Sequence, residues 1–129
     1  LGMKTQVLKI PDIRLEWSDW IPWDSLKIHA KDAGGINLPN KPGVYEVKRR
    51  NQKRRLTIGR GSNLRSRVKQ GLVKGKLPHS TGKRIRRKEH TSVIIVRWVI
   101  TDRPAAAEEE LHKLHRQKLG QLPVYTKHT

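Results

Sequence analysis

Residues 43–72 read GVYEVKRRNQKRRLTIGRGSNLRSRVKQGL, and this stretch decides the fold. Apolar residues alternate with polar or charged ones from Val44 to Val47, which is the period of a half-buried strand. A second strand is predicted from Arg55 to Ile58, because a polar turn at 49–53 separates it from the first. The two strands are therefore expected to pair as an antiparallel hairpin.

A helix is expected directly after the hairpin. Glycines at both ends of residues 59–61 end the second strand, and Ser62 or Asn63 can then cap a helix by accepting a backbone N–H. Apolar residues recur every four positions, which places them on one helix face. This predicted buried stripe consists of Leu64, Val68 and Leu72, and the helix is expected to end near Gly71 and Gly75.

Three further elements complete the predicted core. Residues 93–101 are mostly apolar and β-branched, which predicts a central strand covered on both faces. Pro104 suits the first turn of a helix and Gly120 suits its end, so a helix is predicted between them. A short helix is also expected over residues 24–30, capped by its first or second residue. From residue 44 on, the expected order of elements is strand, strand, helix, strand, helix. This order predicts an α/β fold: a small sandwich with a central three-stranded sheet flanked by helices.

The chain divides into an N-terminal extension and one main domain. Residues 1–40 should pack on or beside the core, with residues 7–16 extended, and residues 41–129 should form the domain. Leu1 and Gly2 precede Met3 and are expected to be a cloning remnant. A length of 129 residues suits a single modest core.

The composition narrows the classes of partner. A formal net charge of +18 favours a polyanion, because each neutralised phosphate releases counterions. The chain has no cysteine, which excludes disulfides, thiolate nucleophiles and Cys-based zinc sites, and is typical of a reducing compartment. We therefore expect a cytoplasmic location. The longest apolar run, Val93 to Ile100, is too short to span a bilayer, so no membrane association is expected.

The positive charge is concentrated in the middle of the chain. Residues 41–90 hold eighteen Lys and Arg against Glu46 and Glu89, whereas residues 1–40 carry no net charge. This distribution predicts a nucleic-acid contact surface. The N-terminal tryptophans either stack on bases or, as we favour, cover an edge of the core. The expected nucleic-acid contacts are Arg60, Arg65, Lys69, His79, Lys83, Arg84 and Arg87.

Several common sites are absent from the sequence. The glycines at 59 and 61 lack the third glycine and the distal acid of a dinucleotide fingerprint, and no P-loop is present. His112 and His115, three residues apart on the last predicted helix, could bind a metal ion. The helical wheel instead favours a solvated position for both.

Short motifs spread over residues 41–126 resemble the GIY-YIG nuclease family. Gly43-Val44-Tyr45 opens the first strand and Thr57-Ile58-Gly59 closes the second. The helix start Asn63-Leu64-Arg65-Ser66-Arg67 follows, and a late acidic helix precedes the closing Tyr125-Thr126. The resemblance implies a metal-dependent endonuclease on the predicted α/β fold, with Gly43 and Gly59 as structural positions.

The resemblance also implies site residues. Tyr45 matches the tyrosine that positions or deprotonates the attacking water, and Arg67 matches the arginine that stabilises charge on the scissile phosphate. A glutamate of the late helix should bind Mg²⁺ or Mn²⁺. The chain departs from the family at Thr57, where a second tyrosine is usual, and at Thr126, where asparagine often follows tyrosine. Gly71 replaces a histidine that some members carry, and His79 is a candidate substitute.

Helix geometry selects among the three glutamates at 108–110. At about 100° per residue, Glu110 lies about 60° from the centre of the apolar arc and Glu108 about 100° away. The predicted arc consists of Ala107, Leu111 and Leu114. Glu110 is therefore the expected metal ligand, and Glu108 is the second choice. Alternatively, all three only complement the helix dipole.

The sequence thus predicts an endonuclease that cleaves DNA in preference to RNA, with Tyr45, Arg67 and Glu110 as catalytic residues. A single domain reads little base sequence, so specificity would need a homodimer or a partner protein. The main alternative is a nucleic-acid-binding module on the same fold with weak or no catalysis. A third is a structural RNA-associated protein, such as a ribosome-bound factor.

Overall fold

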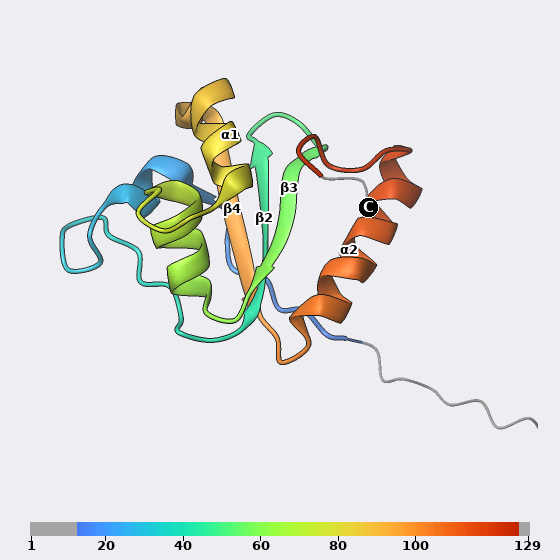
Figure 1. Ribbon diagram of the computed structural model, residues 1–129, viewed down its shortest axis with the longest axis horizontal. Coiled ribbons are helices and arrows are strands. Elements are labelled where there is room, and N and C mark those ends of the chain that lie inside the picture. Colours follow the sequence, from blue (N-terminus) through green and yellow to red (C-terminus); the bar gives the residue numbers. More distant parts are fainter. Residues whose placement is uncertain (1–12, 127–129) are drawn as a thin grey trace, which may run out of the picture.

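The predicted hairpin is the centre of the fold (Figure 1). A computed structural model describes residues 13–126, and the expectations for Leu1, Gly2 and the start of the 7–16 segment lie outside this range. Strands β2 (Gly43–Arg49) and β3 (Arg55–Gly61) pair antiparallel, and β4 (Ile94–Ile100) pairs antiparallel with β2. The sheet has four strands rather than the predicted three, because the short β1 (Ile21–Pro22) joins its edge in the order β1-β4-β2-β3.

Helices cover both faces of the sheet, which makes the protein a small α/β sandwich. Helices η2 (Arg65–Val73) and α1 (Ser80–Lys88) lie on one face, and α2 (Pro104–Leu119) lies on the other (Figure 1). Two short 3₁₀ helices, η1 (Trp23–Lys27) and η3 (Thr91–Val93), connect elements. The helix expected over 24–30 is therefore only the turn η1. No helix within residues 13–126 is both long and apolar enough to cross a bilayer.

The alternation of β2 side chains separates two cores. Tyr45 and Val47 face η2 and α1 in the larger core, whereas Val44 faces α2 with Val99 and Ala107. The predicted stripe of Leu64, Val68 and Leu72 is confirmed, because all three residues are fully buried in the larger core. Its buried members are Trp23, Leu26, Leu38, Tyr45, Val47, Leu56, Leu64, Val68, Leu72, Val73, Ile85, Ile94, Val96, Trp98 and Tyr125.

Helix η2 is a π-helix rather than the expected α-helix. Asn63 caps its start as predicted, because its Oδ1 accepts the N–H of Ser66 at 3.1 Å. Hydrogen bonds in a π-helix span five residues, so residues five apart share a face. Lys69 therefore turns inward beneath Leu64, is 4 % exposed, and donates from Nζ to the carbonyl of Ile36 at 2.7 Å.

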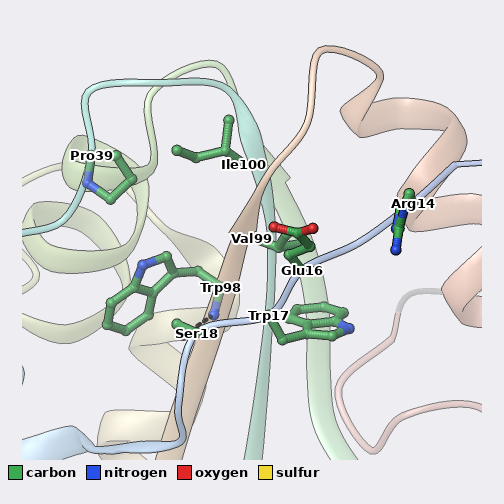
Figure 2. Close-up of a pocket in the computed structure, with 8 residues that line it drawn as sticks. All are labelled: Arg14, Glu16, Trp17, Ser18, Pro39, Trp98, Val99 and Ile100. Carbon is green, nitrogen blue, oxygen red and sulfur yellow. Dashed lines mark hydrogen bonds between the residues drawn. The ribbon is translucent and has the colours of Figure 1, made fainter.

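The N-terminal segment lies along β4. The N–H of Ser18 donates to the carbonyl of Trp98 at 2.9 Å, and Ser18 Oγ accepts the Trp98 N–H at 3.0 Å. Figure 2 shows Trp17 and Trp98 on opposite sides of β4. The hollow drawn there has a volume of about 400 Å³, and Arg14 and Glu16 are its only charged lining residues among those described. It therefore lacks a cluster of side chains suited to catalysis.

A buried carboxylate replaces apolar packing on the α2 side of the sheet. Glu46 is 4 % exposed, and its Oε1 accepts from Arg55 Nε at 3.0 Å and from Arg97 Nε at 2.8 Å. The Arg97 guanidinium carbon lies 4.1 Å from the ring centre of Trp17 and 4.6 Å from that of Trp20. Trp17 packs against the smaller core and Trp23 is fully buried in the larger one, as favoured from the sequence, whereas Trp20 contacts cations.

Replacing Glu46 is expected to destabilise the protein strongly. Glu46→Gln leaves two arginines without a counter-charge in a poorly solvated layer, and we expect a loss of about 3 kcal/mol of unfolding free energy. Urea denaturation measures it. The control Glu110→Gln, at an exposed position, should change stability by less than about 0.5 kcal/mol. Equal stability of the two variants would contradict the role given to Glu46.

Candidate active site

One cavity collects groups from both ends of the domain. It occupies about 360 Å³ between β3, the start of α1, α2 and the C-terminal segment. The chain end reaches it because the N–H groups of Val124 and Tyr125 donate to the carbonyls of Arg55 and Leu56 at 3.1 and 2.9 Å. The cavity is lined by Tyr45, Thr57, Ile58, Gly59, Arg60, Arg67, His79, Thr81, Glu108, His112, Tyr125 and Thr126.

Tyr45 of β2 lies across Gly59 of β3. Tyr45 and Gly59 are paired residues of β2 and β3, so their side chains would share one face of the sheet. A Cβ at position 59 would lie 2.3 Å from Tyr45 Oη. Only glycine therefore lets the phenol reach across β3 into the cavity, which gives the sequence-predicted position Gly59 a physical role. Gly43 has a similar one, since a Cβ there would lie 2.2 Å from the carbonyl oxygen of Val99.

A buried histidine holds the phenol. His79 Nε2 lies 2.8 Å from Tyr45 Oη, and His79 Nδ1 accepts the N–H of Gly82 at 3.0 Å at the start of α1. Because Nδ1 accepts, the proton of the neutral ring sits on Nε2, which must donate to the phenol oxygen. The phenolic proton of Tyr45 is then free for another acceptor.

Burial sets the protonation states of this pair. Burial raises the pKa of Tyr45 to about 12, although the positive charge of Arg67 acts in the opposite direction. Burial, followed by the charges of Arg67 and Arg86, lowers the pKa of His79 to about 4. Near pH 7 the pair is therefore a phenol and a neutral imidazole.

Arg67 supplies positive charge to the same cavity. It lies in the first turn of η2 and is exposed, while its side chain packs close to β3. A Cβ at Gly61 would lie 2.7 Å from Arg67 Cβ, so this glycine admits the arginine to the sheet edge. The structure therefore brings Tyr45 and Arg67 together, as the sequence predicted.

The structure does not bring Glu110 to this cavity. Its side chain is 60 % exposed and Oε1 lies 3.5 Å from Lys113 Nζ, whereas Glu108 lines the cavity with a side chain that is 23 % exposed. Leu114, which the sequence predicts in the apolar arc of α2, is 44 % exposed, and His115 is buried instead. The buried face of α2 is therefore rotated away from Glu110 and toward Glu108.

Two further cavity groups lack partners within the protein. Among the described residues, the buried side-chain nitrogens and oxygens without a hydrogen-bond partner are Trp23 Nε1, His112 Nε2 and Thr126 Oγ1. The last two line the cavity. His112 is therefore not solvated as predicted, and its spacing of four residues from Glu108 is the sequence signal for a shared helix face.

His115 is also not solvated as predicted. It is 7 % exposed, its Nε2 accepts the N–H of Arg55 at 3.0 Å, and its Nδ1 bonds to the carbonyl of Gln121 at 2.7 Å. Both ring nitrogens are therefore used in joining α2 to β3 and to the C-terminal segment. His115 is structural rather than a partner of His112 in metal binding.

A hydrogen-bonded cluster fixes the C-terminal wall of the cavity. Tyr125 Oη donates to Glu89 Oε2 at 2.5 Å, and Arg49 donates to both oxygens of the same carboxylate at 2.7 and 2.8 Å. The bidentate Arg49 keeps the pKa of Glu89 below its ordinary value, while burial raises the pKa of Tyr125 to about 12. Tyr125 thus anchors the chain end beside the cavity.

The predicted nucleic-acid contacts separate into exposed and internal residues. Arg60, Lys83, Arg84 and Arg87 are exposed on β3 and α1. Lys69 does not point outward, because it is buried and donates to the carbonyl of Ile36. Arg65 is half-buried and donates to Leu38 and Asn37. His79 is buried against Tyr45 rather than on an outer contact surface. Further exposed cations of this region are Lys41, Arg50, Lys53, Arg67, Lys76 and Lys88.

The donor set fits an open divalent-metal site, not a closed one. Within residues 13–126, no cluster of three or more His, Cys, Asp or Glu side chains could hold a metal ion. Mg²⁺ typically keeps several waters and binds through one or two carboxylates together with substrate phosphates. Among the described residues, Glu108 is the one carboxylate that lines the cavity and could hold such an ion.

Comparison of the chain with protein-family models, curated proteins and solved structures finds no match. Its functional interpretation therefore depends on the cavity itself.

The His79 ring predicts a loss of stability in mild acid. Its pKa is about 4 in the folded protein and near 6.5 when unfolded, so the unfolded state binds more protons between these values and stability falls as the pH drops through that window. We expect a loss of about 2 kcal/mol between pH 7 and pH 4.5, measured by urea denaturation.

His79→Gln removes this titration and should flatten most of the dependence. A smaller slope should persist, since burial also lowers the pKa of His115. An unchanged slope in His79→Gln would show that the ring is not held neutral as described.

Proposed function

We propose that the protein is a divalent-metal-dependent endonuclease of GIY-YIG type, which hydrolyses phosphodiester bonds of nucleic acid. The observation that carries this proposal is the convergence of Tyr45, Arg67 and Glu108 on one cavity. They come from β2, η2 and α2, so only the fold brings them together. Hydrolysis of a phosphodiester needs an oriented water and positive charge at the phosphate, and this trio supplies both.

Tyr45 is the residue that orients the attacking water. Its oxygen accepts a hydrogen bond from His79 Nε2–H, so its own hydrogen can point to a water in the cavity. With a pKa of about 12 it is a phenol near neutral pH, and its phenolate becomes more abundant as the pH rises. Any phenolate formed is stabilised by the His79 N–H and by the charge of Arg67.

Arg67 and Glu108 complete the chemistry. The exposed guanidinium of Arg67 can bind two phosphate oxygens and offset the charge that grows on them in the transition state. Glu108 would hold Mg²⁺ or Mn²⁺, which supplies Lewis-acid activation of the phosphate when bound. The role first given to Glu110 passes to Glu108 because only Glu108 reaches the cavity.

The basic surface around the cavity supports a polynucleotide substrate. Arg60 lines the cavity, and Arg84 lies over the ring of Tyr125 at 5.1 Å from its centre, so both border the cavity and can contact backbone phosphates on either side of it. The preference for DNA over RNA follows from the family resemblance. We propose that a second copy or a partner protein adds specificity.

A nucleic-acid-binding module with little catalysis is the second candidate. One observation favours it: Thr57 is buried in the cavity wall at the place of the second family tyrosine, so one phenol is missing. The two functions share the basic surface and differ in metal-dependent cleavage.

Nicking of supercoiled plasmid in Mn²⁺ or Mg²⁺ tests the proposal. Glu108→Gln should lower the nicking rate at least 100-fold, because it removes the only carboxylate lining the cavity among the described residues. Glu110→Gln, two residues away and exposed, is the matched control and should keep the wild-type rate.

Salt-sensitive plasmid binding without nicking by the wild type would support the binding module instead. Loss of nicking in Glu110→Gln with retention in Glu108→Gln would instead identify Glu110 as the metal ligand. Competition between duplex DNA and folded RNA measures the nucleic-acid preference.

Gly59→Ala tests the placement of Tyr45 independently of the metal. The added methyl group would displace the phenol, so we expect nicking to fall at least tenfold while duplex binding in EDTA stays within twofold. The control Gly71→Ala adds a methyl group whose nearest neighbour, His79 Cδ2, is 3.4 Å away, and it should retain activity. Full nicking by Gly59→Ala would contradict a role for the Tyr45 position.

A further inference from the structure

Two residues that line the cavity carry a polar atom without a partner in the protein. His112 Nε2 and Thr126 Oγ1 are both buried and make no hydrogen bond. An unpaired buried polar atom costs about 1–3 kcal/mol, so a native structure keeps one where something else supplies the contact. Two of the three such atoms among the described residues belong to residues that line this cavity, so both are available to a bound group.

Glu108 lies one helical turn before His112. Residues four apart on a helix are neighbours on one face, with Cβ atoms about 5–6 Å apart. Both residues line the cavity, so a carboxylate and an imidazole from the same helix border one space. This is the spacing at which a single helix can present two ligands to one metal ion.

Within residues 13–126, Glu108 has only one distant counter-charge. The nearest cation to its carboxylate among the described residues is Arg60, with Nη1 4.0 Å from Oε1. Glu46 and Glu89, by contrast, accept from arginines at 2.5–3.0 Å. The carboxylate of Glu108 is thus held less tightly than those of Glu46 and Glu89, which leaves it able to hold a cation together with the imidazole of His112.

We propose that His112 is a second ligand of the divalent ion held by Glu108, binding through Nε2. The proposal rests on the proposed function only in assigning a metal to Glu108. Imidazole nitrogen is a good ligand for Co²⁺, Ni²⁺ and Zn²⁺ and a poor one for Mg²⁺, which prefers oxygen. The site is therefore selective for nitrogen-binding transition metals over Mg²⁺.

Calorimetric titration of the full chain with Co²⁺ and with Mg²⁺ tests this selectivity. We expect the wild type to bind Co²⁺ at least tenfold more tightly than Mg²⁺. His112→Gln should weaken Co²⁺ binding at least tenfold and change Mg²⁺ binding less than twofold. Glu108→Gln should weaken both, and the exposed control Glu110→Gln should change neither.

The chain has six histidines, so the site must also be located. In imidazole ¹H–¹⁵N spectra, substoichiometric Co²⁺ should broaden the His112 signals first. Unchanged Co²⁺ affinity in His112→Gln, or first broadening at another histidine, overturns the proposal. Weaker binding of a DNA duplex in EDTA by His112→Gln, with Co²⁺ affinity intact, also overturns it and assigns Nε2 to a phosphate.

Activity separates this proposal from the nuclease proposal. If His112-dependent Co²⁺ binding occurs but no metal supports plasmid nicking, the metal site stands and the nuclease assignment fails. If Mg²⁺ supports nicking and His112→Gln leaves Co²⁺ affinity unchanged, the nuclease stands and His112 is not a ligand.

Discussion

The close approach of the Tyr45 phenol to Gly59, which has no side chain, determines how the cavity is arranged. Tyr45 crosses β3 at Gly59, where any Cβ would overlap the phenol oxygen. From this position Tyr45 meets His79, and His79 in turn accepts the Gly82 N–H that begins α1. The contact between Tyr45 and Gly59 across the hairpin is thereby connected, through His79, to the position of α1. The hydrogen bonds leave the phenolic proton facing the cavity.

The carboxylates of the protein differ in how closely cations neutralise them. On the α2 face, Glu46 is fully occupied by Arg55 and Arg97, so its charge is neutralised where it is buried. Glu89 is likewise held by Arg49 and Tyr125. In the cavity, by contrast, Glu108 has only Arg60 as a counter-charge among the described residues, at 4.0 Å, and His112 Nε2 makes no hydrogen bond. The carboxylates that hold elements together are thus paired more tightly than the one that lines the cavity.

Glu108 and His112 show why periodicity alone did not find the site. An apolar arc that includes Leu114 favours Glu110, but the helix packs on the sheet with His115 inward and Leu114 outward. A histidine can be buried where both nitrogens find partners, and a single-residue hydrophobicity pattern does not contain that information. Lys69 was misplaced for a related reason, since the π-helix shifts the buried face by one residue and brings a lysine to the Ile36 carbonyl.

The sequence by itself determined the hairpin, the bounds of the last helix, the glycine positions and the concentration of positive charge, because these depend on local backbone preference and composition. It also pointed to Tyr45 and Arg67, which occupy fixed places relative to the hairpin. Tertiary structure alone decided which glutamate reaches the cavity, that His79 supports Tyr45, and that His112 faces Glu108's space. Those positions depend on how α1 and α2 are oriented about their axes against the sheet. That orientation is set by packing between residues far apart in the chain.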